Sequence, residues 1–204
     1  MSVKVYDLKK LKISGIAGFA ATLVVFSCII IAVASWSQFS WVNNALSDLG
    51  VQNGATAIVF NCGLVFGGLL FFVFAVGLFR FASDGFVGKL GAAVFVLACV
   101  MLMSIGVFNE NFSPTHYIVS VGLFTLMPIS MLFLVAAFWV QGKQRMSVFT
   151  LGLALFAATV WLLEFAVSYD SGVAIPEFVS GLAGAAWVTV TSYLMLKESS
   201  KAFS

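Results

Sequence analysis

Six long runs of apolar residues, separated by short polar connections, constrain this chain more than any other feature of its sequence. They cover residues 13–36, 55–79, 90–108, 117–140, 147–168 and 178–196. Each run is close to the 20 or so mainly apolar residues that a helix needs to cross a bilayer. Because backbone groups in hydrocarbon must satisfy their own hydrogen bonds, the pattern predicts six transmembrane helices in one bundle.

Composition supports this interpretation. Of the 204 residues, 62% are hydrophobic and only 9% are charged, whereas ordinary soluble domains carry about 25% charged residues. A domain of this size could not hide so many apolar side chains from water. We therefore expect an all-α polytopic membrane protein, with residues 1–204 forming a single six-helix domain.

The basic residues are distributed asymmetrically. They all fall in the two terminal tails or in the second and fourth connections, and they are Lys4, Lys9, Lys10, Lys12, Arg80, Lys89, Lys143, Arg145, Lys197 and Lys201. The first, third and fifth connections carry acidic residues instead, namely Asp48, Glu110, Asp170 and Glu177. The positive-inside rule then predicts a multi-pass protein of the cell membrane with both termini in the cytoplasm. The basic residues serve as orientation signals, so nucleic acid is not an expected partner.

The first connection contains the stretch WVNNALSDLG, which is unusually polar for so apolar a chain. On a helical wheel at about 100° per residue, its polar and apolar side chains separate onto opposite faces. The polar face holds Ser40, Asn43, Asn44, Ser47 and Asp48, and the apolar face holds Trp41, Val42, Ala45, Leu46 and Leu49. Ser40 suits an N-cap and Gly50 suits a helix end. The pattern predicts a short amphipathic helix at the membrane surface, with its polar face turned to water or inward over the bundle.

Other polar residues occur at a similar depth. Glu164 is the only formally charged residue inside any run, and an ionisable side chain there should face the bundle interior or a cavity. Asn61, Ser104 and Ser120 lie near the same surface, and the single histidine, His116, precedes the fourth run. We therefore predict an outward-facing polar pocket. Its candidate binding residues are Asn44, Ser47, Asp48, Asn61, Glu110, His116 and Glu164.

The chemistry of this pocket stays open at the level of sequence. A nucleophilic arrangement of Ser47, His116 and Asp48 is disfavoured, because adjacent residues would both have to engage one imidazole ring. A carboxylate–histidine metal site is conceivable, but the chain has one histidine and no ligand spacing. We assign no metal and no catalytic residue, and the cofactor is unknown.

Small residues predict close helix packing. Gly63 and Gly67 form a G-x-x-x-G pair, and Gly181 and Gly184 form a second small face. Such pairs let helices approach closely, either within the bundle or across the interface of a homo-oligomer.

Three motifs carry a family resemblance: NALSDLG, FNCGLVFGGLLF and GVFNENFSPTHYIVSVGLF. Together they resemble an uncharacterised prokaryotic six-span membrane protein family, the domain of unknown function 998. The resemblance points to Ser47, Leu49, Gly50, Asn61 and His116. The layout is also distantly similar to eukaryotic six-span lipid-remodelling proteins, which include a factor for glycosylphosphatidylinositol lipids.

These observations favour a protein that binds or modifies a membrane lipid at its head group, with membrane lipids as its partners. A small transporter or channel that uses Glu164 is one alternative. A non-catalytic membrane assembly partner is another. The sequence does not decide whether the protein is an enzyme.

Overall fold

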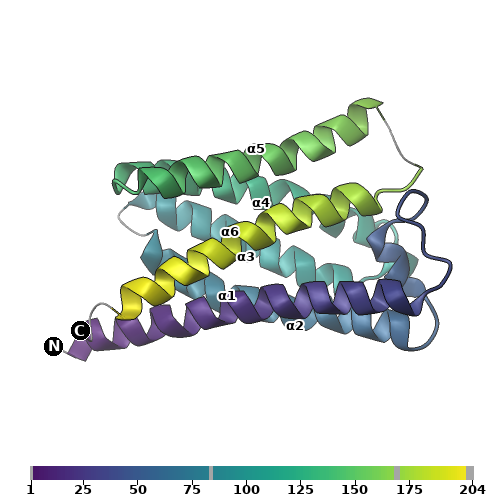
Figure 1. The fold of residues 1–204 in the computed structure, drawn as a ribbon, viewed down its shortest axis with the longest axis horizontal. Coiled ribbons are helices and arrows are strands. Elements are labelled where there is room, and N and C mark those ends of the chain that lie inside the picture. Colours follow the sequence, from purple (N-terminus) through teal and green to yellow (C-terminus); the bar gives the residue numbers. More distant parts are fainter. Residues whose placement is uncertain (1, 83–84, 168–170, 201–204) are drawn as a thin grey trace.

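The computed structural model of the protein describes residues 2–82, 85–167 and 171–200, and helices make up its regular structure throughout (Figure 1). The elements are α1 (Ser2–Ser35), η1 (Leu46–Val51), α2 (Ala55–Phe81), α3 (Phe86–Val107), η2 (Glu110–Phe112), α4 (Thr115–Val140), α5 (Gln144–Val167) and α6 (Ala174–Ser200). The all-α prediction is confirmed. Asp170, Lys201 and residue 168, the last of the fifth predicted run, lie outside the described residues.

In the described part of the chain, six helices are long and apolar enough to cross a membrane. They match the six predicted runs, and the shortest of them, α3, has 22 residues, more than the roughly 20 that a bilayer requires. The chain is therefore a multi-pass membrane protein.

The six helices form a ring in sequence order. Each packs against the next one along the chain, and α6 returns to pack against α1 (Figure 1). Both ends of the chain lie at one end of the bundle with the α2–α3 and α4–α5 connections, and we call this the termini end. The three remaining connections, with η1 and η2, form the opposite end, which we call the η1 end.

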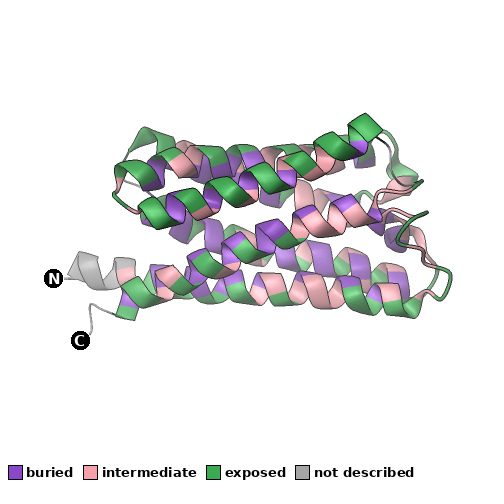
Figure 2. Cartoon of the chain, turned by 45° about the horizontal axis from the view of Figure 1, so that its top comes forward, coloured by how far each residue is buried: buried purple, intermediate pink, exposed green. Residues whose placement is uncertain are grey.

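The outward surface of the bundle is apolar. Exposed residues line the outer sides of the helices (Figure 2), and they include Leu23, Ile58 and Val140, which are 69%, 64% and 82% exposed. Such side chains suit a hydrocarbon surrounding, where apolar residues need not be buried inside the protein. Small residues instead mark the sides on which helices meet.

The glycine pair of α2 is used inside the bundle. A Cβ added at Gly63 would collide with Cys28 of α1, and one added at Gly67 would collide with Val25 of the same helix. The predicted role in close helix packing is confirmed for this pair. Both glycines are buried against α1. Homo-oligomerisation through them stays a prediction.

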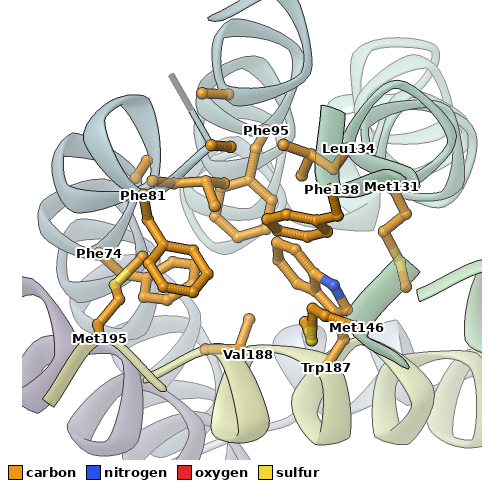
Figure 3. Packing of buried hydrophobic residues seen from close by; sticks show 14 of the residues in the cluster. Phe74, Phe81, Phe95, Met131, Leu134, Phe138, Met146, Trp187, Val188 and Met195 are labelled. Atoms are coloured by element: carbon orange, nitrogen blue, oxygen red, sulfur yellow. The ribbon is translucent and has the colours of Figure 1, made fainter. Parts of the chain in front are cut away.

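The termini half of the bundle is filled with large side chains (Figure 3). Trp187 of α6 lies at its centre, fully buried, and its Nε1 donates a hydrogen bond to Thr150 Oγ1 of α5 at 3.0 Å. The rings of Phe74 and Phe95 pack against it at centroid distances of 6.0 and 5.6 Å. The aromatic contacts connect α2 and α3 to α6, and the hydrogen bond of Trp187 adds α5 to the same core.

The first connection does contain a short helix, but it is shorter and begins later than the helical wheel indicated. It is the 3₁₀ helix η1, and residues 41–43 form a turn before it. Ser40 caps that turn, since its Oγ accepts the backbone N–H of Asn43 at 3.2 Å. The apolar face is divided, because Leu49 is fully buried while Trp41 is 38% exposed. η1 therefore packs into the end of the bundle instead of lying flat on its surface.

The first and fifth connections are bonded to each other. Gly172 N–H donates to Val42 O at 2.8 Å, and Ala174 N–H donates to Asn44 O at 2.9 Å. Gly172 is required by this close approach, because a Cβ there would collide with the backbone of residues 43–44. This pairing fixes the segment that leads into η1 against the start of α6.

Candidate functional site

Most of the predicted site residues meet at the η1 end, around η1 itself. We call this group the polar cap. It consists of Asn44, Ser47, Asp48, Asn61, Asn109, Glu110, His116 and Glu177. The cap joins η1 and η2 to the starts of α2, α4 and α6.

Asp48 organises η1 locally. Its Oδ2 accepts the side-chain amide of Asn44 at 2.7 Å and the backbone N–H of Ala45 at 3.0 Å. Bonding between a carboxylate and the backbone three residues earlier stabilises the start of a short helix. Asn44 in turn accepts the backbone N–H of Ser40 through Oδ1 at 2.9 Å. The polar residues of WVNNALSDLG are therefore largely occupied in shaping this connection.

Longer-range bonds hold η1 in the bundle. Ser47 Oγ donates to Glu110 Oε1 at 2.7 Å, and the backbone N–H of Leu46 donates to Glu177 Oε2 at 2.6 Å. On the α2 side, Gly50 O accepts the side-chain amides of Asn61 at 2.9 Å and Asn109 at 3.3 Å. These two bonds connect η1 to η2 through Glu110 and to α6 through Glu177.

Gly50 contributes more than the helix end that the sequence suggested. It lies inside η1, whose C-cap is Gln52. A Cβ at Gly50 would lie 2.6 Å from Asn61 Oδ1, so glycine allows the close approach of η1 to α2. Asn61 Oδ1 is buried and accepts no described hydrogen bond.

Glu110 lies in an environment that favours its neutral form. Burial raises the pKa of its carboxyl group, the hydroxyl of Ser47 opposes that rise, and the negative charge of Asp48 adds to it. The first, third and fifth connections contain no lysine or arginine, and His116 is the basic group near Glu110 that opposes the rise. The cap is therefore an acidic group of side chains in which protons are retained more readily than in water.

His116 is bonded differently from the arrangement considered at the sequence level. Its Nδ1 lies 2.8 Å from Phe108 O, and its Nε2 lies 3.4 Å from Ser120 Oγ. A carbonyl oxygen can only accept, so Nδ1 carries a proton. Ser47 and Asp48 bond elsewhere, and the described residues hold no Ser47–His116–Asp48 triad. They also contain no group of three metal-binding side chains placed to hold an ion.

Glu164 lies apart from the polar cap. It is 8% exposed on α5, and none of the described hydrogen bonds connects it to the cap. Its Oε2 has no described partner. The interior position expected for an ionisable residue in a span is confirmed, whereas its predicted share in the pocket stays a prediction.

A cavity of about 150 Å³ lies directly beneath η1. Its walls come from α1, α2, α3, α4 and α6, and α5 contributes none of them. Four of the lining residues have hydroxyl or carboxylate side chains, and all four lie toward the η1 end: Ser47, Ser120, Glu177 and Ser180. We call these four residues the rim. The other lining residues are apolar or, like Cys99, behave as apolar when buried.

The cavity is about one leaflet deep. Its lining runs from Phe60 to Phe71 on α2 and from Glu177 to Val188 on α6, a separation of 11 residue numbers on each helix. At about 1.5 Å per residue this corresponds to roughly 16 Å, close to half of the approximately 30 Å hydrocarbon core of a bilayer. Phe95 lines its deep end and packs against Trp187, so the filled core closes the cavity there.

Glu177 was not among the predicted site residues, although it was recognised as acidic. Its place in the first turn of α6 suits a residue that only interacts with the helix start. The bond to Leu46 and its position in the cavity wall depend on how η1 folds. A glutamate immediately before the sixth apolar run was the available signal.

Six membrane-spanning helices around a capped, one-leaflet-deep cavity define the class of this molecule. The chain belongs to the family described as protein of unknown function (DUF998), whose model matches residues 19–193. The resemblance drawn from the three motifs is confirmed, and the matched segment contains the whole polar cap and the whole cavity lining. No curated protein and no solved structure matches the chain. The distant similarity to eukaryotic lipid-remodelling proteins stays a prediction.

Proposed function

We propose that the protein binds a membrane lipid, with an acyl chain in the cavity and the head group at the polar cap. The observation that carries this proposal is the cavity's distribution of polarity with depth. Its apolar walls extend over the depth of one leaflet, and its hydroxyl and carboxylate side chains gather at the end where a head group would lie.

The apolar part favours hydrocarbon over water. Cavities of about this volume with apolar walls stay dry and take apolar ligands. The cavity is narrow for its length, since about 150 Å³ is distributed over roughly 16 Å. A single acyl chain has that shape, and lipid acyl chains are the most abundant groups of that shape around a membrane protein.

The charge distribution supports an outward-facing cap in the cell membrane. Basic residues of the second and fourth connections and of the tails lie at the termini end, and acidic residues lie at the η1 end. The positive-inside rule then places both termini in the cytoplasm. A membrane-impermeant thiol reagent applied to intact cells should label Asn53→Cys and spare Gln144→Cys, both at exposed positions. Labelling only at position 144 would reverse the orientation.

Lipid binding can be tested with a substitution whose side chain fills the cavity. Gly181 lines it, and a Cβ there meets only Phe26 at 3.6 Å, so Gly181→Leu extends a side chain into the open space. Gly152→Leu is the matched control, because Gly152 is exposed on α5 and a Cβ there meets nothing within 4 Å. Native mass spectrometry of the protein purified in mild detergent should show bound lipid in the wild type and Gly152→Leu, and much less in Gly181→Leu. Equal lipid in all three would overturn the proposal.

Glu164 supports a second candidate function, proton-coupled transport. Its buried carboxylate oxygen without a described partner is costly in a membrane helix unless it exchanges a proton or a ligand. Proteoliposomes loaded with a pH-sensitive dye would report proton flux. Glu164→Gln should abolish that flux, and Glu198→Gln, at an exposed site near the end of α6, should preserve it. Absence of flux in the wild type would remove this candidate.

A further inference from the structure

The cavity has the same depth along three of the helices that form its walls. On α3 its lining runs from Phe95 to Ile105, a separation of 10 residue numbers, which corresponds to about 15 Å at 1.5 Å per residue. This value agrees with the roughly 16 Å along α2 and α6. The cavity therefore has a defined length from its rim to its deep end.

The deep end is closed by packed side chains. The lining ends at Phe71 on α2, Phe95 on α3 and Val188 on α6, and we call these three residues the floor. The rings of Phe71 and Phe95 are in contact at a centroid distance of 6.5 Å. Behind Phe95 lie Phe74 and Trp187, both fully buried, each with its ring centroid 5.6 Å from that of Phe95 (Figure 3). A chain that enters from the rim therefore stops at the floor.

The other end of the cavity is polar. On α6 the rim extends from Glu177 to Ser180, and Ser120 of α4 lies at the same end. An ester or other polar group of a lipid can form hydrogen bonds there, and it would lose them between the apolar walls further in. The polar end of a bound lipid is therefore held at the level of Glu177 to Ser180, and the space below it for a chain is limited.

This depth corresponds to a number of carbons. A carbon–carbon bond of about 1.5 Å at an angle of about 111° lengthens an extended chain by roughly 1.25 Å per carbon. Ser180 and Val188 are separated by 8 residue numbers, which is about 12 Å or roughly 10 carbons. From Glu177, the depth of roughly 16 Å corresponds to about 13 carbons.

The volume of the cavity agrees with that length. About 10–15 Å³ of cavity volume takes one group of the size of a water molecule, and a methylene group is of similar size. The cavity of about 150 Å³ therefore takes roughly 10–15 carbons. A space this narrow leaves no room for a chain to fold back, so a bound chain has to be extended.

We propose that the cavity selects lipids by the length of one acyl chain, that it takes chains of up to about 10–13 carbons, and that Phe95 in the floor sets this limit. This inference rests on the proposed lipid binding and assigns the class of lipid. Chains in a fluid leaflet are partly coiled, so a chain that fills a leaflet of about 15 Å is longer than the cavity when it is extended. The preferred ligand therefore has a shorter chain than lipids of that kind.

The affinity for lipid in detergent micelles should change abruptly at the limit. Up to about 13 carbons, each added methylene moves from one hydrocarbon surrounding to another, so the affinity should change little. Beyond the limit, each further methylene stays among the polar groups of the cap, and its exposure should weaken binding by about fourfold.

The experiment measures binding against chain length with one head group. The probes are lysophosphatidylcholines with octanoyl, decanoyl, dodecanoyl, tetradecanoyl, hexadecanoyl and octadecanoyl chains. They are mixed in equal amounts with delipidated protein in detergent, and the bound lipids are quantified by native mass spectrometry. The three shortest should bind within a few-fold of one another, and the hexadecanoyl lipid should bind about tenfold less or weaker still. Equal binding of the dodecanoyl and octadecanoyl lipids would overturn the proposal.

Two neighbouring alanines of α6 provide a matched pair of variants. Ala185 lines the cavity 3 residue numbers before Val188, and Ala186 is exposed. Ala185→Leu should obstruct about 4.5 Å at the deep end and shorten the limit by about 4 carbons. The dodecanoyl lipid should then lose about tenfold or more in binding relative to the octanoyl lipid. Ala186→Leu should keep the wild-type profile.

Phe95→Ala tests the floor in the opposite direction. Removal of the ring lengthens the cavity, so the hexadecanoyl lipid should gain binding relative to the dodecanoyl lipid. Because Phe95 is buried in the core, this variant can also lose stability, and Ala185→Leu with its control decides the question if Phe95→Ala does not fold. A limit that stays at the same chain length in both variants would contradict the role of the floor.

The outcomes separate the two proposals. Binding that does not depend on chain length, or a limit that Ala185→Leu does not move, would overturn the inference about length while lipid binding stands. Failure of lipids of every length to bind, together with equal lipid in Gly181→Leu and the wild type, would remove the proposed function itself.

Discussion

The two halves of this bundle use the same six helices in opposite ways. In the termini half, large side chains such as Phe74, Phe138 and Trp187 fill the space between the helices completely. In the η1 half, Gly181, Gly184 and their neighbours leave a cavity, and hydrogen bonds of the polar cap close its end. One half is held by packing, and the other is closed by polar contacts around an open space.

The difference shows where a membrane protein can place a binding site. In hydrocarbon, helix association depends on close packing and interhelical hydrogen bonds, because burial of apolar surface gains little. The close packing in the termini half holds the six helices of the ring together. The η1 half can therefore leave space between its helices without loss of the fold, provided that the cap stays bonded.

The largest expected effect is a loss of stability from a substitution in the core of the termini half. Trp187→Ala should lower the free energy of unfolding by about 3–5 kcal/mol, because it removes a fully buried ring from a close-packed core. Leu123→Ala, in the cavity wall, should cost only about 1 kcal/mol, since that side chain already lacks partners on one side. Unfolding in mixed micelles with increasing dodecyl sulfate measures both. Equal costs for the two variants would mean that the cavity is not an open space.

The second effect is smaller and confined to the cap. Gly172→Ala should force the fifth connection away from residues 43–44 and break its two backbone hydrogen bonds to the first connection. At roughly 0.5–1.5 kcal/mol for each bond, the cap should open locally at a cost of about 1–3 kcal/mol. Hydrogen exchange should rise in 42–50 and stay unchanged in the termini half. A uniform rise over the whole bundle would show that the two halves do not behave separately.

The spans were predictable because a chain that crosses hydrocarbon can adopt few backbone conformations. Runs of about 20 apolar residues must be helices that bond internally, and the predicted start of α2 at residue 55 agrees with the structure. The grouping of Ser47, Asp48 and Glu110 followed from their common membrane depth, which the order of the spans determines. These inferences required no knowledge of how side chains pack.

The shape of η1 was not predictable from its own sequence. A helical wheel assumes an α-helix, and it does not register that Asp48 bonds back to Ala45 or that Glu177 takes the Leu46 N–H from α6. The cavity depends on side chains from five helices, so no single run carries its signal. Ser120 was placed at the right depth, but its position in the cavity wall becomes evident only after the helices are packed.

The smallest expected effect is a change of stability with pH that arises at the η1 end and not at the termini end. Burial and the charge of Asp48 raise the pKa of Glu110 above the ordinary value of 4.5, so the folded protein binds this proton more tightly than the unfolded chain does. The stability from this group is therefore fully present below about pH 4.5 and is lost as the pH rises through the raised pKa. Thermal unfolding in detergent should show a melting temperature that falls by a few degrees at most over that range.

Glu110→Gln should flatten that part of the profile, because the amide keeps an acceptor for Ser47 and carries no titrating proton. Glu198→Gln, at the exposed site near the end of α6, should leave the profile as in the wild type. Since the pKa shift arises from the acidic cap, the pH dependence should belong to the η1 half alone. A wild-type profile in Glu110→Gln would place the titrating group elsewhere and would remove Glu110 from the account of the cap's acidity.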